Sequence, residues 1–206
     1  MRQKGDKKGT IFVSFSVIIN LCSEKKGENM FTKNFFRILD GYIRRTGARS
    51  YTVAGLVNYN GSISSDLSVG ASTKPQEILG ALGTPRADTN YGTAGGVYFG
   101  TGTTPATPDD FRMESPITDS SVLHVDAPGE TGVYRSFDGD CYRISASYDV
   151  TNTTDHDLAI SELGLFGAYS STQAYLYDHT VLDEPIIIPA GATMPINYAF
   201  EFLYGM

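Results

Sequence analysis

The stretch that decides the fold is Ile144-Ser-Ala-Ser-Tyr148-Asp-Val150, read together with the sequence after it. Apolar and polar residues alternate there, which is the period-two pattern of a strand with one buried face. The pattern returns over residues 194–202, and further apolar runs separated by short turn sequences lie between. The predicted strands are 144–150, 158–166, 174–182, 185–188 and 194–202. This order predicts a mainly β, antiparallel domain of the β-sandwich or jelly-roll-like type over residues 97–206.

An N-terminal amphipathic helix is predicted over residues 31–45. Phe35, Ile38 and Tyr42 recur at helical spacing, and Thr32 has the side chain of an N-cap. Two interpretations stay open for this helix: it packs on the chain's own sheet, or it docks on a neighbouring subunit.

The segment between this helix and the β domain is read in pieces. A strand is predicted over residues 51–59, ending in the turn sequence Asn60-Gly61. Residues 62–96 form a Gly/Ser/Thr-rich loop region, and segments of this length are often binding or interface loops. Residues 30–61 thus supply the helix and first strand, and 30–206 are expected to be one domain.

Residues 1–29 differ in character from the rest. A basic start is followed by an apolar run over residues 11–22, which is similar to a signal peptide. No small-residue cleavage site follows, and Lys25-Lys26-Gly27-Glu28-Asn29 can be encoded by a purine-rich ribosome-binding sequence ahead of Met30. The segment is therefore interpreted as an over-extended reading frame, as an export signal, or as an ordered arm.

The charge balance argues against binding to nucleic acid. The chain of 206 residues has a formal net charge of -7. Six of the 16 basic and three of the 23 acidic residues lie in 1–29, which leaves ten basic and twenty acidic residues in the body. An acidic surface repels phosphate backbones. No apolar run reaches the roughly 18 residues of a membrane-spanning helix, so no membrane partner is predicted, and two cysteines define no disulfide framework.

Sequence patterns for catalysis, cofactors or metals are weak. Gly100-x-Gly102 lacks the remaining glycine of a dinucleotide fingerprint. His156 stands between two aspartates, but adjacent strand residues point to opposite faces and do not converge on one metal. The sequence around Asp138 and Asp140 suits a tight turn better than a calcium loop. We therefore predict no catalytic residue, no cofactor and no metal ligand.

One acidic residue is out of place in this pattern. Glu162 lies inside an otherwise apolar predicted strand and is interpreted as an outward-facing or hydrogen-bonded structural residue. A buried carboxylate of raised pKa could instead serve catalysis. A glycosidase normally needs two facing carboxylates, however, and no partner for Glu162 is evident from the sequence.

Three segments together resemble small structural proteins of tailed-bacteriophage tails, baseplates and fibres. They are Gly100-Thr-Gly-Thr-Thr-Pro-Ala-Thr-Pro-Asp-Asp110, Ile160-Ser-Glu-Leu-Gly-Leu-Phe166 and Val181-Leu-Asp-Glu-Pro-Ile-Ile-Ile-Pro-Ala-Gly191. Order and approximate spacing agree over residues 97–204. The resemblance implies a non-enzymatic β-sandwich protein of the virion that acts in a symmetric assembly.

This resemblance leads to expectations about partners. The chain is expected to form a homo-oligomer and to contact other virion proteins, as a tail, baseplate, fibre or head-attachment component. Residues 62–96 and the loop over residues 100–110 would make the contacts. Thr107 and Pro108 within that loop also predict the start of a brief helix. The expected interface residues are Gly100, Thr101, Gly102, Thr103, Thr104, Pro105, Asp109 and Asp110.

A carbohydrate-binding or adhesin-like module of the bacterial surface is the alternative function. Its support is a set of tyrosines that could stack on a glycan, and the competing interpretation is ordinary strand packing. A cleavable export signal would favour this alternative, whereas translation from Met30 would favour the phage particle. The tyrosines are Tyr134, Tyr142, Tyr169, Tyr175 and Tyr177.

Overall fold

The computed structural model describes most of the chain between residues 30 and 203 and one short strand before it. Strands make up 58% of the described residues, most strand pairs are antiparallel, and α1 (Lys33–Arg44) precedes the long strands. The prediction of a mainly β chain with an N-terminal helix is confirmed. Within the described ranges, no helix has the length and apolarity needed to span a membrane. These ranges are 15–20, 30–44, 51–64, 67–69, 85–86, 91, 95–126, 133–138, 141–170 and 173–203.

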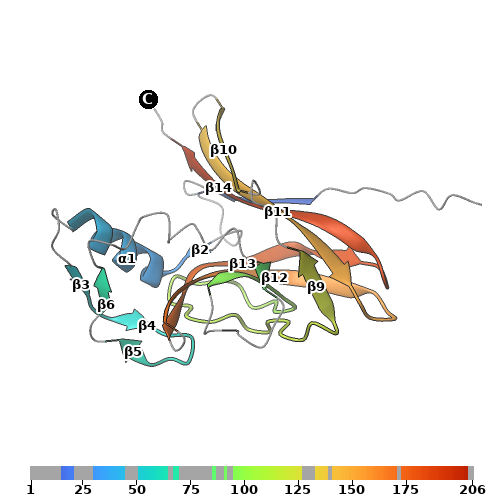
Figure 1. Ribbon diagram of the computed structural model, residues 1–206, viewed down its shortest axis with the longest axis horizontal. Helices are drawn as coiled ribbons and strands as arrows, with labels where there is room; N and C mark the ends of the chain where they lie inside the picture. Colours follow the sequence, from blue (N-terminus) through green and yellow to red (C-terminus); the bar gives the residue numbers. More distant parts are fainter. Residues whose placement is uncertain are drawn as a thin grey trace, which may run out of the picture.

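Sheet A holds the C-terminal strand and is the first of two five-stranded sheets (Figure 1). Its strands follow the order β1-β14-β11-β10, and β9 pairs with β11 beyond the stretch that pairs with β10. β1 runs parallel to β14, whereas the other pairs are antiparallel. The bounds are β1 Phe15–Asn20, β9 Leu123–Asp126, β10 Val133–Asp138, β11 Cys141–Asn152 and β14 Thr193–Leu203.

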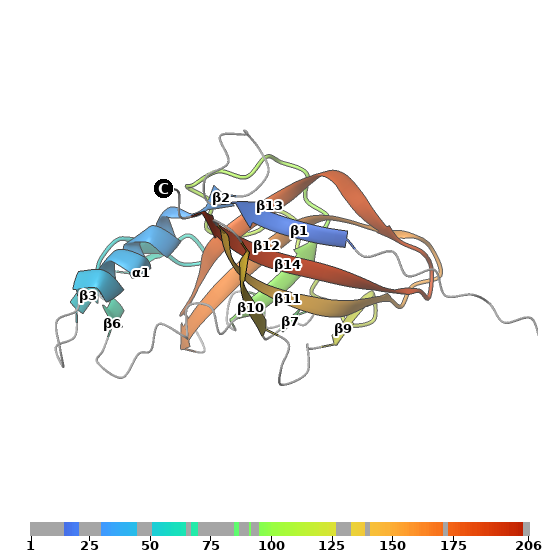
Figure 2. The same ribbon diagram turned by 90° about the horizontal axis from the view of Figure 1, so that it is seen from above.

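Sheet B has the order β2-β13-β12-β8-β7 and lies across sheet A in both views (Figures 1 and 2). Its long strands β12 and β13 are adjacent and antiparallel, and β7 joins β8 in parallel. The bounds are β2 Met30–Phe31, β7 Pro85–Arg86, β8 Gly96–Gly100, β12 Leu158–Ser170 and β13 Gln173–Ile188.

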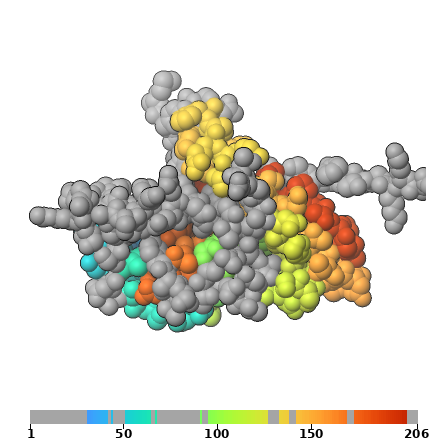
Figure 3. All heavy atoms as spheres, in the orientation of Figure 1, coloured from blue at the N-terminus to red at the C-terminus, as the bar shows by residue number. Residues whose placement is uncertain are grey.

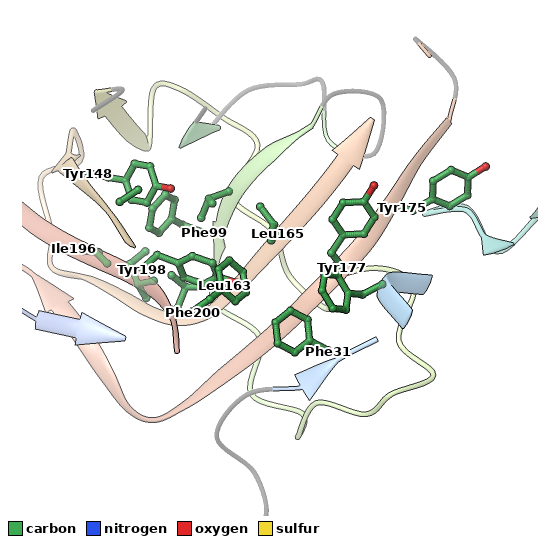
Figure 4. Close-up of a cluster of buried hydrophobic side chains, with 14 of the residues drawn as sticks. Phe31, Phe99, Tyr148, Leu163, Leu165, Tyr175, Tyr177, Ile196, Tyr198 and Phe200 are labelled. Carbon is green, nitrogen blue, oxygen red and sulfur yellow. The ribbon is translucent and has the colours of Figure 1, made fainter. Parts of the chain in front are cut away.

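Side chains from both sheets fill one hydrophobic core (Figure 4). The alternation that predicted β11 and β14 is confirmed, because Tyr148 and Tyr198 are fully buried. Rings meet across the sheets: the Phe99 and Tyr148 centroids are 5.9 Å apart, and those of Phe31 and Phe200 are 5.3 Å apart. Burial of such large side chains, each worth about 1.5–3 kcal/mol, holds the two sheets together.

The predicted helix is confirmed as α1, and it packs on the chain's own sheet rather than extending as an arm. Phe35 and Ile38 are buried, and the Phe35 ring lies 6.2 Å from that of Tyr177 in β13. Thr32 lies at the predicted N-cap position, where its carbonyl accepts from the N–H of Phe36 at 3.5 Å, and its hydroxyl donates to the carbonyl of Leu176 at 2.5 Å. The helix start is thereby tied to sheet B.

The predicted strand over 51–59 is interrupted in the structure. Gly55 adopts a positive φ of 75°, which separates two short strands, and Gly61 (φ 83°) lies in the predicted Asn60-Gly61 turn. The turn joins β4 to β5, and β3 pairs instead with β6. The bounds are β3 Tyr51–Val53, β4 Leu56–Val57, β5 Ile63–Ser64 and β6 Leu67–Val69.

The strands predicted over 174–182 and 185–188 are in fact one strand, β13. Ile186 pairs with Ile160 and Val181 pairs with Glu162, so residues 182–185 bulge out of register with β12. Pro185 has no N–H to donate, and a bulge tolerates that loss. Pro185, which predicted a break between two strands, thus lies in a bulge of a single strand.

Of residues 1–29, the structure describes only the backbone of β1, which lies beside β14. The three interpretations of this segment therefore stay predictions. Most of the loop region 62–96 likewise lies outside the described residues.

Candidate functional site

The candidate site lies on the outer face of sheet B, where the chain between β8 and β9 crosses the sheet. This crossing segment, residues 101–122, contains the predicted interface motif. A second small core beneath it joins Met113 to Tyr98, Phe166 and Leu176. We call residues 101–115 the motif loop.

Strand register brings the charged residues of the site to one face. Glu162 pairs with Gly100 on one side and Val181 on the other, while Gly164 pairs with Tyr98 and His179. Because side chains two residues apart along a strand share a face, Glu162 and Gly164 lie on the same side as the neighbouring His179. The register shift between Leu165 and Phe166 makes Tyr177 an extra residue in β13. Such bulges re-aim the side chains that follow them.

The Glu162 carboxylate is fully buried and accepts four hydrogen bonds. Oε1 accepts from the backbone N–H of Glu114 at 2.5 Å and from His179 Nε2 at 2.8 Å. Oε2 accepts from the N–H groups of Ser115 at 3.0 Å and Gly102 at 3.2 Å. A carboxylate has about four lone-pair sites, so the Glu162 acceptors are fully used.

Charge and hydrogen bonding keep Glu162 ionised. Burial would raise its pKa, but the bonds from His179 and from the Ser115 and Glu114 amides outweigh burial, and the pKa lies below its ordinary value. Glu162 is hydrogen-bonded as predicted, although it faces the motif loop and not solvent. Its purely structural role stays a prediction.

His179 lies between two carboxylates. Its Nδ1 is 2.5 Å from Asp110 Oδ2, and its Nε2 contacts Glu162. Burial would lower its pKa, yet the hydrogen bonds to Asp110 and Glu162 raise it to about 9. At neutral pH the imidazole is therefore a cation, and both ring N–H groups donate.

Asp110 connects His179 to the turn of the motif loop. Its Oδ2 also accepts from the N–H of Thr107 at 2.8 Å, and its Oδ1 accepts from the Thr107 hydroxyl at 2.6 Å. Burial would raise the pKa of Asp110, and the bonds from His179 and Thr107 lower it below the ordinary value. The helix predicted to start at Thr107 is absent here, because residues 108–109 form a turn closed by this side chain.

Two glycines make room for this arrangement. A Cβ on Gly100 would lie 2.6 Å from Glu162 Oε2 and 2.7 Å from the Ser115 carbonyl oxygen. A Cβ on Gly102 would also lie 2.6 Å from Glu162 Oε2 and 2.8 Å from the Glu114 Cβ. The glycines of the motif are therefore required by close packing over the Glu162 carboxylate.

The exposed rim of the loop is fixed by a second carboxylate. Glu114 Oε2 accepts from the N–H groups of Thr103 at 2.8 Å and Thr104 at 2.9 Å, and Oε1 accepts from the Thr104 hydroxyl at 2.9 Å. The hydrogen bonds from Thr104 and Thr103 lower the pKa of Glu114. This arrangement gives the rim a defined shape.

An open pocket of about 350 Å³ lies against the motif loop. Its walls include Pro105, Phe111 and Met113, with Asp110 and His179 beside them. Asp109 on the rim pairs with Lys33 of α1 at 2.5 Å. The acidic groups and the histidine of this pocket are thus already engaged within the chain, and the Arg112 guanidinium lies 5.6 Å from the centroid of the Phe111 ring.

The predicted interface residues divide into two groups. Three point inward or hold the loop, since Gly100 and Gly102 are buried and Asp110 binds His179. Five are exposed and form the rim: Thr101, Thr103, Thr104, Pro105 and Asp109.

Sequence analysis did not identify His179 or Glu114 as part of the site. His179 follows a run of strand residues with no motif around it, and only the register of β12 and β13 places it beside Gly164. The signal that could have pointed to the site was Glu162, a carboxylate in an apolar strand that needs a cation and donors nearby.

The other histidines lie at the surface. His156 Nδ1 is 2.9 Å from Asp155 and His124 Nε2 is 3.1 Å from Asp126, with all four side chains exposed. In the described part of the chain, no three potential ligands are grouped around a metal position. The alternative calcium loop near Asp138 includes residues 139–140, which lie outside the described ranges.

The five tyrosines of the alternative function have different environments. Tyr175 and Tyr177 are buried, which favours strand packing for both. Tyr134 is exposed, and Tyr142 is partly buried against Phe137. The side chain of Tyr169 is outside the described part.

Comparison with known proteins gives no relative on which to base a family. No family model, curated protein or solved structure matches the chain. Function is therefore argued from the geometry above.

Proposed function

We propose that the chain is a non-enzymatic structural component of a tailed-phage particle, a tail, baseplate, fibre or head-attachment protein that acts through subunit contacts. The observation that carries the proposal is the Glu162 carboxylate, which joins two of the three phage-like segments by holding the Gly102 amide of one from the middle of the other. In this proposal the protein is located in the virion.

In this proposal, sheets A and B form a β-sandwich of jelly-roll-like type that serves as the rigid body. The loop rim formed by Thr101, Thr103, Thr104, Pro105 and Asp109 presents exposed backbone and side-chain groups to neighbouring subunits. Because Glu162 and Glu114 fix the loop from below, little conformational entropy would be lost on assembly. Preorganised loops of this kind suit repeated contacts around a symmetry axis.

The same geometry argues against a glycosidase. A general acid needs a raised pKa and a free oxygen facing the substrate. Glu162 instead has a lowered pKa, and four donors occupy its oxygens. Asp110 is linked to it through a cationic His179, so the two carboxylates do not face each other across a substrate space.

The carbohydrate-binding alternative retains one specific observation. Tyr134 is 60% exposed and Phe137 is 76% exposed, so aromatic rings are available for stacking on a glycan. The burial of Tyr175 and Tyr177 removes two of the five candidate rings. We therefore favour subunit contact over glycan contact.

The test is the solution mass of the full chain by light scattering, followed by electron microscopy of any assembly. We expect a defined ring or higher oligomer. Pro105→Arg, on the loop rim, should reduce assembly, whereas Ile187→Arg, which adds the same charge at an exposed site in β13, should not. A monomer at high concentration that binds a glycan in a screen would overturn the proposal.

A further inference from the structure

The β10–β11 hairpin extends sheet A beyond the body of the molecule (Figure 1). β10 pairs with β11 from Val133–Ala146 to Asp138–Cys141. In the part of the chain that the structure describes, β10 is the last strand on its side of the sheet. An edge strand presents backbone N–H and C=O groups that can pair with another strand.

This edge carries exposed aromatic surface. Phe137 is 76% exposed and its ring centroid lies 4.6 Å from that of Tyr142 on β11. Arg135 is exposed and pairs with Ile144, whose side chain is buried in the core. Side chains at alternate positions share a face, so Arg135, Phe137 and Tyr142 continue the core face of sheet A past its covered part. Figure 3 shows β10 at the surface of the molecule.

Natural proteins normally protect such edges. β10 is short and carries the charged Arg135 on the core face, and both features weaken an edge for pairing, but none of its six residues is a lysine or a proline. Apolar surface of this kind marks an interaction site more often than chance. The question is which partner fits it.

We propose that β10 pairs with β10 of a second copy of this chain, antiparallel, about a two-fold axis that passes through Ser136. The two sheets A would then join into one continuous sheet across the axis. The contact is isologous, since each copy contributes the same strand.

The register follows from symmetry, strand length and charge, because only an axis through Arg135 or Ser136 pairs five of the six residues of β10. A two-fold axis perpendicular to the sheet keeps each residue on the same face in both copies, so only residues of equal parity can lie opposite each other. If the axis passes through Arg135, two arginines face each other, which is unfavourable. If it passes through Ser136, Arg135 of each copy faces Phe137 of the other.

The Ser136 register therefore makes two symmetric cation–π contacts. Each Arg135–Phe137 pair places a guanidinium beside an aromatic face, an arrangement worth about 0.5–1 kcal/mol at exposed sites. Backbone pairing and coverage of Phe137 add to this. The partner is thus selected by complementarity within one six-residue strand.

A cysteine on the axis tests the register directly. In a full-length background with Cys22→Ser and Cys141→Ser, Ser136→Cys should form an intermolecular disulfide under oxidised glutathione. Directly opposed residues of antiparallel strands lie about 4.5–5.5 Å apart at Cα, within the span of a disulfide. Tyr134→Cys is the matched control, because the two copies of residue 134 lie four residues apart along the pair and should not cross-link. Equal cross-linking by both variants, or by neither, would overturn the proposal.

A second measurement does not depend on cysteine chemistry. Phe137→Asp in the full chain should weaken self-association at least tenfold by sedimentation or light scattering. Ile63→Asp is the matched control, because Ile63 is 72% exposed at a site remote in sequence from β10. Unchanged association in Phe137→Asp, or an equal loss in both variants, would contradict the contact.

The proposed β10 contact goes beyond the proposed function. Experiments can disprove either hypothesis without disproving the other. An assembly that forms normally without a Ser136→Cys cross-link would remove the β10 contact and leave the virion proposal intact. A cross-linked dimer that never forms a larger particle would support the contact and count against the virion proposal.

Discussion

Sheet B contains two buried carboxylates whose surroundings differ. Glu162 on β12 faces the motif loop and accepts from His179 and three backbone amides. Asp178 on β13 faces sheet A and accepts from Tyr198 at 2.5 Å and Thr180 at 2.9 Å, while its Oδ1 has no hydrogen-bond partner among the residues that the structure describes. Both side chains are fully buried.

The pKa values of the two carboxylates are shifted in opposite directions. The pKa of Glu162 lies below its ordinary value, whereas burial raises the pKa of Asp178 to about 6 despite the bonds from Tyr198 and Thr180. Burial acts on both carboxylates, and the number of donors and the adjacent cation decide whether its effect on the pKa is overcome. On the outer face of sheet B, the ionised Glu162 therefore has all of its hydrogen-bond partners. Between the sheets, ionisation of Asp178 lowers the stability of the fold.

Removing the Glu162 carboxylate should have the largest effect. Glu162→Ala leaves the Nε2–H of the cationic His179 and three backbone N–H groups without their acceptor, which should lower the free energy of unfolding by about 3–5 kcal/mol. Chemical denaturation measures the change. Glu184→Ala, at an exposed site in β13, is the control and should change stability by less than about 0.5 kcal/mol. A loss below about 1 kcal/mol in Glu162→Ala would contradict the role of Glu162.

The cation between the carboxylates predicts a loss of stability at alkaline pH. The pKa of His179 is raised from 6.5 to about 9 in the folded chain. Its contribution is thus complete below about pH 6.5 and is lost as pH rises through about 9, a change of about 3 kcal/mol. Unfolding at pH 6.5 and 9.5 should show this loss in the parent and in His156→Gln, but not in His179→Gln. An equal slope in all three would sink the prediction.

Asp178 also predicts a loss of stability as pH rises, but at lower pH than His179 does. Its pKa is raised from 3.8 to about 6, so folding bears no ionisation cost below about pH 4 and the full cost above about pH 6. Asp178→Asn should therefore gain stability relative to the parent between pH 4 and 7, by about 2 kcal/mol. Thermal unfolding at both pH values measures the difference. A gain that does not change with pH would show that Asp178 is not ionised at a cost.

Substitution of the glycines by alanine should change the free energy of unfolding least. The two variants compare contact with rigid backbone and contact with a flexible side chain. Gly100→Ala would place Cβ 2.7 Å from a backbone carbonyl, whereas Gly164→Ala would meet the flexible Met113 side chain at 2.8 Å. We expect Gly100→Ala to cost about 2 kcal/mol and Gly164→Ala about 1 kcal/mol or less. Denaturant midpoints of both variants test this order, and the reverse order would contradict the packing described above.

Alternation of apolar residues was sufficient to predict β11 and β14. Tyr148, Val150, Ile196 and Tyr198 show it most clearly, and all four are buried. β9 and β10 were not predicted, because they span only four and six residues, too few for an alternation such as that of Leu123 and Val125 to stand out. The continuity of β13 was missed for a related reason, since Pro185 gives the same signal in a bulge as in a turn.

The site was predictable only in part. The motif loop and Glu162 were identified from the sequence, but their contact was not, because 60 residues separate Gly102 from Glu162. His179 joins them only through the register shift next to Tyr177. Such a cluster depends on strand pairing, and one sequence carries no direct signal of which residues are paired across strands.

Amide hydrogen exchange at Gly102, Glu114 and Ser115 tests most directly whether Glu162 holds the motif loop. We predict slow exchange of these three amides in the parent chain. In Glu162→Gln the same amides should exchange at least tenfold faster, while amides of β11 and β14 stay protected. Fast exchange at all three positions in the parent, or rates that Glu162→Gln leaves unchanged, would contradict the account.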